Sequence, residues 1–230
     1  MKEKDSKLQQ TKANKILAKI SDFFIKNRKL LLIVGIAIIV GLIVLSVCLI
    51  VADSNENKLQ VSVDALQTRE EELFQKTDYS DEDYASLISD LQTAESKGGK
   101  AYSGVKASYI LGLSYLAAED NDNAYDSFMR VYEKNPKSYL APLALFNAAV
   151  VKDNVGDQDA ALALYDKITA EYGFDAGVAP KALFNSARIH LAKGDTELAK
   201  STFQQIVDEY SGSSSSSEYV ALSKNALLTL

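Results

Sequence analysis

The octapeptide ALFNAAVV occupies residues 144–151, and the nearly identical ALFNSARI occupies residues 182–189, 38 positions later. The similarity extends beyond the octapeptides, because residues 144–172 align with residues 182–210 without a gap. The matched pairs are Asn147/Asn185, Ala149/Ala187, Gly156/Gly194, Asp157/Asp195, Ala161/Ala199, Tyr165/Phe203 and Ile168/Ile206. Self-similarity at a fixed period of this length is the sequence signature of a repeat architecture.

Each copy is predicted to be a helical hairpin, in which a first helix, a tight turn and a second helix follow one another. Gly156 and Gly194 stand where a glycine in the left-handed conformation ends a helix. Aspartates follow at the N-cap position of the second helix, namely Asp120, Asp157 and Asp195. Small residues then allow the two helices to approach closely, and aromatic residues one turn later fill the space; these are Ala124, Ala161 and Ala199, then Phe128, Tyr165 and Phe203.

A third copy lies upstream, at Leu111, Gly112, Tyr115, Ala124, Phe128, Val131 and Pro136. Its spacing resembles the tetratricopeptide repeat, and the resemblance covers residues 105–210. The other two copies depart from the pattern, with Ala148-Ala149 and Ser186-Ala187 in place of the Leu-Gly pair. Their longer period is similar to that of the longer-looped repeats of bacterial envelope proteins. The resemblance implies a stack of hairpins, since one hairpin cannot bury its apolar face alone.

Residues 30–52, LLLIVGIAIIVGLIVLSVCLIVA, contain no charge. A helix of this length crosses a hydrocarbon core of about 30 Å. Lys26, Arg28 and Lys29 precede the run, so the positive-inside rule predicts a cytoplasmic N-terminus and an extracytoplasmic body. A cleaved signal peptide, the alternative, usually has a shorter apolar region. Cys48 is interpreted as an inert apolar residue rather than a lipid acceptor, because Val47 is bulky where a lipoprotein site needs a small residue.

The first 29 residues carry nine Lys and Arg against three acidic residues. Lysines share one predicted helix face, with apolar residues beside it; they are Lys12, Lys15, Lys19 and Lys26, and Ile16, Ile20, Phe23 and Phe24. This pattern suits a helix lying at an anionic cytoplasmic surface. A disordered basic tail remains the alternative for residues 1–14.

The segments that flank the repeats are also predicted to be helical. A helix over about residues 56–76 and a second one, capped by Ser80 and stopped at Gly98-Gly99, would form a degenerate leading hairpin. Near the C-terminus, Ser215 and Glu218 have the spacing of a capping box that opens a last helix.

We therefore predict an all-α chain, with a single N-terminal transmembrane helix followed by an α-solenoid of tetratricopeptide-like hairpins and a C-terminal capping helix. The predicted domains are a basic cytoplasmic head with an amphipathic helix (1–29), the transmembrane helix (30–52), a helical stalk with the degenerate leading hairpin (53–100), three repeats (101–210), and a Ser-rich loop with the capping helix (211–230). A basic head, one apolar span and a short repeat array together resemble the single-pass tetratricopeptide proteins (YfgM-like) that accompany the bacterial secretion translocon.

Catalytic, cofactor and metal sites are not expected. The single His190 has no thiol near it in the predicted repeats, and the acidic clusters lack the spaced ligands of a calcium loop. Nucleic acid is not an expected partner, because the net charge is −6 and the first 29 residues contribute +6, which leaves −12 on the body.

The tetratricopeptide resemblance implies a concave groove lined by the first helix of each hairpin. Its predicted peptide-contacting residues are Tyr109, Leu113, Phe146, Asn147, Val150, Phe184, Asn185 and Arg188, with Lys106 and Lys181 at the rim. Packing between hairpins is an equally good interpretation of Phe146 and Phe184, because regularly spaced aromatic residues are often part of a core.

The predicted function is that of a scaffold in the cytoplasmic (inner) membrane, not an enzyme, whose periplasmic C-terminal domain binds polypeptides. An accessory or chaperone-like role in protein export is favoured, with polypeptide clients or the secretion translocon as partners. The alternative is an adaptor for complexes of cell-envelope or cell-wall assembly.

Overall fold

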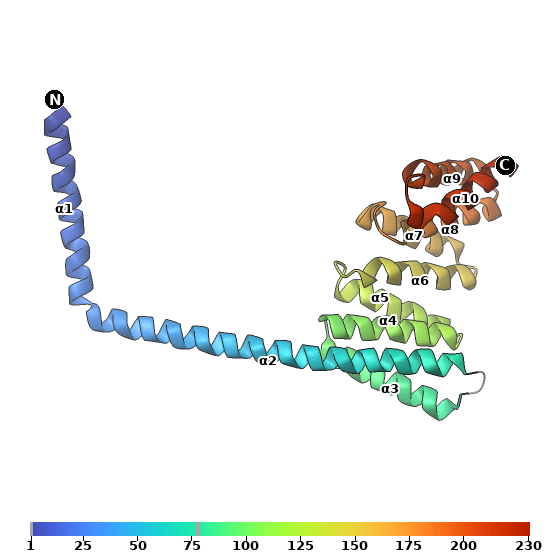
Figure 1. Ribbon diagram of the computed structural model, residues 1–230, viewed down its shortest axis with the longest axis horizontal. Helices are drawn as coiled ribbons and strands as arrows, with labels where there is room; N and C mark the ends of the chain where they lie inside the picture. The colour runs from blue at the N-terminus through green and yellow to red at the C-terminus, as the bar shows by residue number, and fades with distance from the viewer. Residues whose placement is uncertain (1, 77–78) are drawn as a thin grey trace. The chain divides into compact units, whose positions relative to one another are not determined.

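A computed structural model describes the backbone of residues 2–76 and 79–230, and the side chains of these residues from Asn14 onward. Within that range the chain is all-helical, as predicted, and contains no strand. Its helices (Figure 1) are α1 Lys2–Lys26, α2 Arg28–Gln75, α3 Asp81–Gly98, α4 Tyr102–Ala117, α5 Asn121–Lys134, α6 Leu140–Asn154, α7 Gln158–Tyr172, α8 Ala179–Lys193, α9 Thr196–Tyr210 and α10 Ser217–Thr229, with a 3₁₀ turn at Ser214–Ser216.

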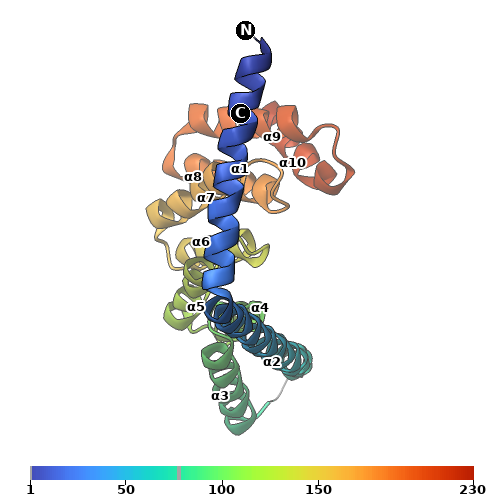
Figure 2. The ribbon, with the colours of Figure 1, turned by 90° about the vertical axis from the view of Figure 1, so that its left-hand side faces the viewer.

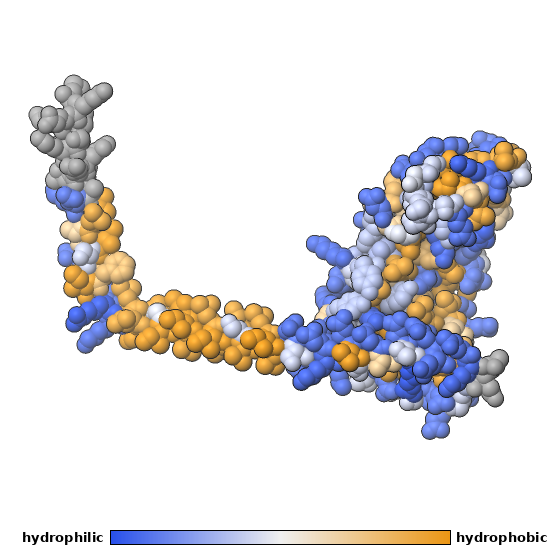
Figure 3. All heavy atoms as spheres, viewed as in Figure 1, coloured by the Kyte–Doolittle hydropathy of each residue, from blue (hydrophilic) through white to orange (hydrophobic). Residues whose placement is uncertain are grey.

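The chain divides into two compact units, one ending at Asn55 and one running from Glu56 to Leu230. The first unit holds α1 and the N-terminal part of α2, whose apolar side chains are exposed along residues 30–51, apart from the half-buried Leu31 (Figure 3). The sequence suggested separate helices before and after residues 53–55, but α2 runs through them without a break. The segment Asp53-Ser54-Asn55 has no Gly or Pro, so nothing in it stops a helix.

The second unit is a stack of antiparallel hairpins, α4/α5, α6/α7 and α8/α9, each packed on the next (Figure 2). The C-terminal half of α2 and α3 precede them as a leading pair, whose core includes Val63, Leu87 and Leu91. At the other end, α10 packs on α9 and α8 and buries Val220. The fold is therefore a tetratricopeptide-like solenoid.

The interior of each hairpin is built around a small residue and an aromatic ring on its second helix. The alanines are fully buried, and no aromatic ring is more than 2 % exposed; the pairs are Ala124/Phe128, Ala161/Tyr165 and Ala199/Phe203. A Cβ atom added to Gly112 on α4 would lie 2.5 Å from the Phe128 ring, which explains the glycine of the Leu-Gly pair. The small residues that recur in the repeat pattern are therefore those that allow the two helices of a hairpin to pack closely.

The turns inside the hairpins match the sequence pattern in part. Gly156 and Gly194 have φ values of 84° and 85°, as predicted for left-handed glycines. In the first hairpin the equivalent position is Glu119, at φ 61°. Because Glu119 has a Cβ atom, this backbone conformation costs about 1–2 kcal/mol there that a glycine would avoid.

The predicted caps are also correct in part. Asp120 and Asp157 accept hydrogen bonds from the backbone N–H groups three residues on, and Ser80 caps α3 in the same way. Asp195 occupies the N-cap position of α9 without making this bond. The capping box of Ser215 and Glu218 was wrong, because a 3₁₀ turn precedes α10 and moves its N-cap to Ser216, which makes no side-chain cap.

Successive hairpins are joined by contacts that recur one repeat apart. The Tyr172 hydroxyl donates to the Pro136 carbonyl oxygen at 2.8 Å, and the Tyr210 hydroxyl donates to the Phe174 carbonyl oxygen at 2.8 Å. Burial raises the pKa of each phenol to about 12, so both remain donors at physiological pH. Each tyrosine ties the end of a second helix to the loop that follows the preceding hairpin.

A half-buried carboxylate on α3 is one of the polar contacts between the leading pair and the first hairpin. Glu95 Oε1 on α3 accepts from Ser108 Oγ, Arg130 Nε and Lys134 Nζ at 2.8–2.9 Å. Desolvation by burial opposes ionisation, but the hydrogen bonds from Lys134 and Ser108 and the Arg130 charge outweigh it and lower the Glu95 pKa. Three helices, α3, α4 and α5, therefore converge on a single charged oxygen.

The hairpin interior should not tolerate a larger residue. Replacing the fully buried Ala161 with Phe forces a ring between α6 and α7 and should lower the free energy of unfolding by about 1–3 kcal/mol. Ala163 lies on the same helix but is exposed, so Ala163→Phe is the matched control and should change stability little. Denaturant unfolding of residues 56–230 measures both, and equal stability of the two variants would contradict the repeat register.

Candidate functional site

The predicted groove residues lie on the first helices of three successive hairpins. Tyr109 and Leu113 are on α4. Phe146, Asn147 and Val150 are on α6, and Phe184, Asn185 and Arg188 are on α8. Arg188 is exposed, Phe146 is only 5 % exposed, and the other six residues are half-buried. The peptide-binding role of this set stays a prediction, but the contacts of its members can be stated.

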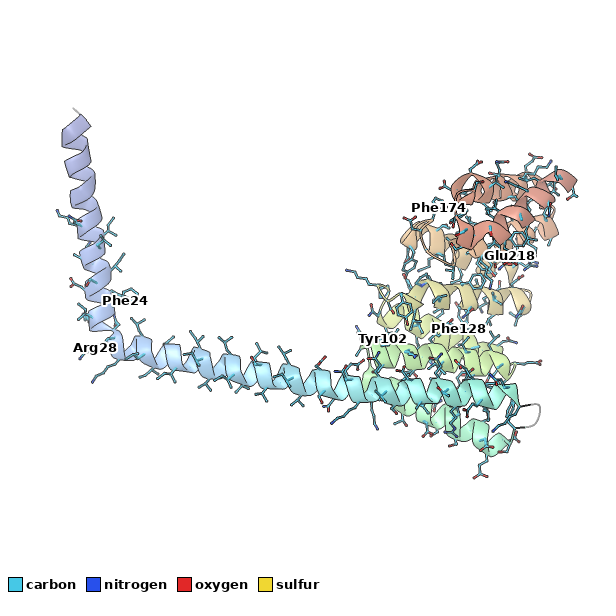
Figure 4. All side chains as sticks on the ribbon, in the orientation of Figure 1. Phe24, Arg28, Tyr102, Phe128, Phe174 and Glu218 are labelled. Atoms are coloured by element: carbon cyan, nitrogen blue, oxygen red, sulfur yellow. The ribbon has the colours of Figure 1, made fainter. Side chains whose placement is uncertain are left out.

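Each aromatic residue of the set packs on the second-helix ring of its own hairpin, and Phe184 also packs on Tyr219 of α10, with ring centroids 5.9 Å apart. Ring centroids are 5.8 Å apart for Tyr109 and Phe128, 5.7 Å for Phe146 and Tyr165, and 5.6 Å for Phe184 and Phe203. Figure 4 labels Phe128 within the first hairpin. Each first-helix ring therefore completes the core around the aromatic residue of the second helix, and Phe146 belongs to the core by its burial as well.

The polar residues of the set form a ladder between neighbouring first helices. Asn147 Nδ2 donates to the Tyr109 hydroxyl at 3.0 Å, which joins α6 to α4. Arg188 pairs with Asp153 and thereby joins α8 to α6. At the N-terminal end, the rim residue Lys106 pairs with Asp64 of α2 at 2.6 Å. The amide and the two cations are thus oriented by the protein itself.

Lys181, the second predicted rim residue, belongs to this ladder through an aromatic ring. Its Nζ lies 4.7 Å from the centroid of Phe146, within the range of a cation–π interaction. The contact places a basic side chain of α8 over the face of a ring on α6. Lys181 as a whole remains exposed to solvent.

Two partners in this ladder, Asp64 and Asp153, were missed in the sequence. Each lies about one repeat before its cation, so opposite charges at that separation were the available signal. Asp153 also contributes to the electrostatics of Tyr165, whose pKa is raised to about 12 by burial first and by this carboxylate second. Burial likewise raises the Tyr109 pKa, against the effect of the Asn147 hydrogen bond. Both phenols are neutral at physiological pH.

The chemistry left for a ligand on this face is mixed. Leu113 and Val150 offer half-buried apolar surface at equivalent positions of α4 and α6, and Arg188 takes that position on α8. The Arg188 side chain is 50 % exposed, although Asp153 neutralises part of its charge. Such a surface can contact an extended polypeptide through apolar side chains and one partly satisfied cation.

Two hollows at the loops between hairpins also escaped the sequence analysis. The first has a volume of about 420 Å³, and its lining includes Pro136, Tyr139, Pro142, Glu171 and Tyr172. The second, of about 340 Å³, uses residues one repeat later, including Phe174, Pro180, Glu209 and Tyr210. Their signal in the sequence was the recurrence of Pro and Tyr residues 38 positions apart, at Pro142 and Pro180 and at Tyr172 and Tyr210.

His190 lies near the end of α8, beside an acidic residue of the following turn. His190 Nδ1 lies 3.8 Å from Asp195 Oδ2, next to the turn between α8 and α9. Among the residues that the structure describes, no group of three or more His, Cys, Asp or Glu side chains is arranged to hold a metal ion.

Comparison with known proteins identifies tetratricopeptide repeats in this chain. The tetratricopeptide-repeat family model matches residues 106–138 and residues 181–213, which cover most of the first and third hairpins and reach into the loops that follow them. No curated protein matches the chain.

Two crystal structures of the nearly identical TPR-like repeats of a protein designated a kinesin light chain, from Podospora anserina, are similar in fold. Their TM-scores are 0.54 and 0.53 at 12 % sequence identity, and each alignment covers 69 % of this chain. The alignments cover 81 % and 82 % of those chains. Tetratricopeptide repeats indicate a protein–protein interaction scaffold, and hence protein partners.

If this face is a peptide-binding groove, substitutions at its accessible positions should weaken binding, whereas a substitution at its buried position should lower stability. Arg188→Ala and Val150→Ser alter partly accessible side chains, so both variants should fold and bind an unfolded polypeptide more weakly, with a several-fold higher Kd. Phe146→Ala removes a buried ring and should lower the free energy of unfolding by about 3–5 kcal/mol. Titration with a fluorescent, permanently unfolded polypeptide and thermal unfolding measure the two effects. Unchanged Kd values for the first two variants would contradict a groove on this face.

Proposed function

We propose that this chain is a membrane-anchored scaffold whose repeat unit binds polypeptides outside the cytoplasmic membrane, as an accessory or chaperone-like partner of protein export. The observation that carries the proposal is the joining of two features in one helix. An uncharged apolar run occupies the N-terminal part of α2, and the C-terminal part of α2 is the first helix of a tetratricopeptide solenoid.

The apolar run has the properties that a bilayer requires. It lies in a helix that is long and apolar enough to cross a membrane, and its most apolar stretch is not buried against any part of the chain that the structure describes. Large side chains such as Ile33, Leu42 and Ile50 are 58–68 % exposed. Exposed apolar surface of this extent is rare in water and is expected against lipid.

Charges beside the run favour one orientation. Lys26, Arg28 and Lys29 lie on its N-terminal side, whereas Asp53 and Glu56 lie on its C-terminal side. Because basic residues are retained on the cytoplasmic side, the repeat unit would lie outside. An export role accounts for a protein-binding solenoid on the outer side of the cytoplasmic membrane, because exported polypeptides emerge unfolded on that side.

The orientation can be tested with a reporter fused after Leu230. A phosphatase that is active only outside the cytoplasm should be active in this fusion, and the protein should stay with membranes during salt and carbonate washes. A reporter active only in the cytoplasmic orientation would overturn the topology. Release by the washes would overturn the spanning helix.

The partner is tested by affinity capture of the intact membrane protein, followed by mass spectrometry. Subunits of the secretion machinery and exported polypeptides are expected to be enriched over a control chain in which residues 30–52 are kept and residues 101–230 are deleted. Enrichment of enzymes of envelope or cell-wall assembly instead would replace the export role by the adaptor role.

A further inference from the structure

The C-terminal half of α1 carries large apolar side chains that nothing in the described chain covers. Five of them, Ile16, Leu17, Ile20, Phe23 and Phe24, are 47–62 % exposed. Their nearest ring contact is between Phe23 and Phe24, whose centroids are 6.0 Å apart. Figure 4 labels Phe24 in the last turn of α1, and Figure 3 shows apolar atoms gathered along the helix.

These residues share one side of the helix. Successive residues advance by about 100° around a helical axis, so the five fall within a sector of about 120°. Lysines line one edge of that sector, at Lys15, Lys19 and Lys26. The opposite side carries small or polar residues such as Ala18 and Ser21, with Ile25 as its one large apolar member among the described side chains. We call the five-residue sector the apolar face of α1.

The helix is interrupted directly after this face. Asn27 forms a turn between α1 and α2, and its Nδ2 donates to the Phe23 carbonyl oxygen at 2.9 Å. The same carbonyl oxygen accepts from the Asn27 backbone N–H at 3.0 Å, so the backbone and the side chain of Asn27 both bond to the last turn of α1. Arg28 and Lys29 then open α2 ahead of the apolar run. Their charges are costly inside hydrocarbon, so α1 cannot follow α2 into a bilayer.

We infer that α1 is a lipid-binding helix that lies along the headgroup region of an anionic bilayer, with its apolar face toward the acyl chains and its lysine row on phosphate groups. The inference rests on the proposed function to the extent that residues 30–52 span that bilayer. Only Asn27, Arg28 and Lys29 separate α1 from the span, so the headgroup region is within reach. Lysines beside an apolar face suit an anionic lipid surface, because each basic residue near such a surface strengthens binding roughly five-fold.

The absence of tryptophan from the chain permits a sharp test. Phe23→Trp places a single reporter on the apolar face, and Ala18→Trp places one on the opposite side as a matched control. Full-length protein is reconstituted in vesicles of phosphatidylcholine, with or without phosphatidylglycerol. With phosphatidylglycerol present, the emission of the Phe23→Trp protein should shift to the blue and be quenched by lipids brominated on their acyl chains. The indole of the Ala18→Trp control should remain accessible to aqueous acrylamide.

The lysine row is tested in the same Phe23→Trp protein. Lys15, Lys19 and Lys26 are replaced together by Gln, which retains length and hydrogen bonding but removes charge. The response to phosphatidylglycerol should then fall at least ten-fold, whereas protein retention by the vesicles should not change.

The possible results distinguish this inference from the span on which it rests. Protein that fails to float with the vesicles would overturn the span. Protein that floats but leaves Phe23→Trp and Ala18→Trp equally accessible to acrylamide would overturn the surface helix. Equal burial of Phe23→Trp with and without phosphatidylglycerol would overturn the anionic preference.

Discussion

The burial of a small residue and an aromatic ring in the interior of each hairpin is the constraint on which the repeat unit depends. Ala161 beside Tyr165, and its two equivalents, let paired helices approach closely enough to exclude water. A single hairpin still leaves one apolar face open, so the next hairpin must cover it. The leading pair and α10 close the two ends of this series, and the stack therefore requires more than the three repeats alone.

The same interior packing determines which side chains can serve binding. The aromatic residues of the first helices pack on the rings of the second helices, with ring centroids 5.6–5.8 Å apart, and so face the interior of the hairpins. The outward positions that remain are tied to one another by Asn147 with Tyr109 and by Arg188 with Asp153. A polypeptide that binds this face would meet side chains held in place before it arrives, which reduces the entropy lost on binding.

Features that depend on local sequence could be predicted, and features that depend on distant partners could not. The left-handed Gly156 and the cap at Asp157 follow from neighbours within a few residues. Glu119 gave no such signal, because its left-handed backbone is imposed by the hairpin around it. Asp64 and Asp153 pair with cations on other helices, so the spacing of opposite charges by about one repeat was the signal that the sequence offered for them. For the candidate groove, the helices and positions were predictable, whereas the burial of Phe146 depends on how far Lys181 and Tyr165 cover it.

The tyrosine junctions give the solenoid a property useful for engineering. Tyr172 meets the Pro136 carbonyl as Tyr210 meets the Phe174 carbonyl, so the end of one hairpin presents the same attachment point as the end of the next. A duplicated copy of residues 141–178, inserted after residue 178, would bring its own tyrosine and its own acceptor carbonyl. The array could in this way be lengthened one hairpin at a time, with α10 still closing the end, and the number of stacked hairpins would become a quantity that an experimenter can choose.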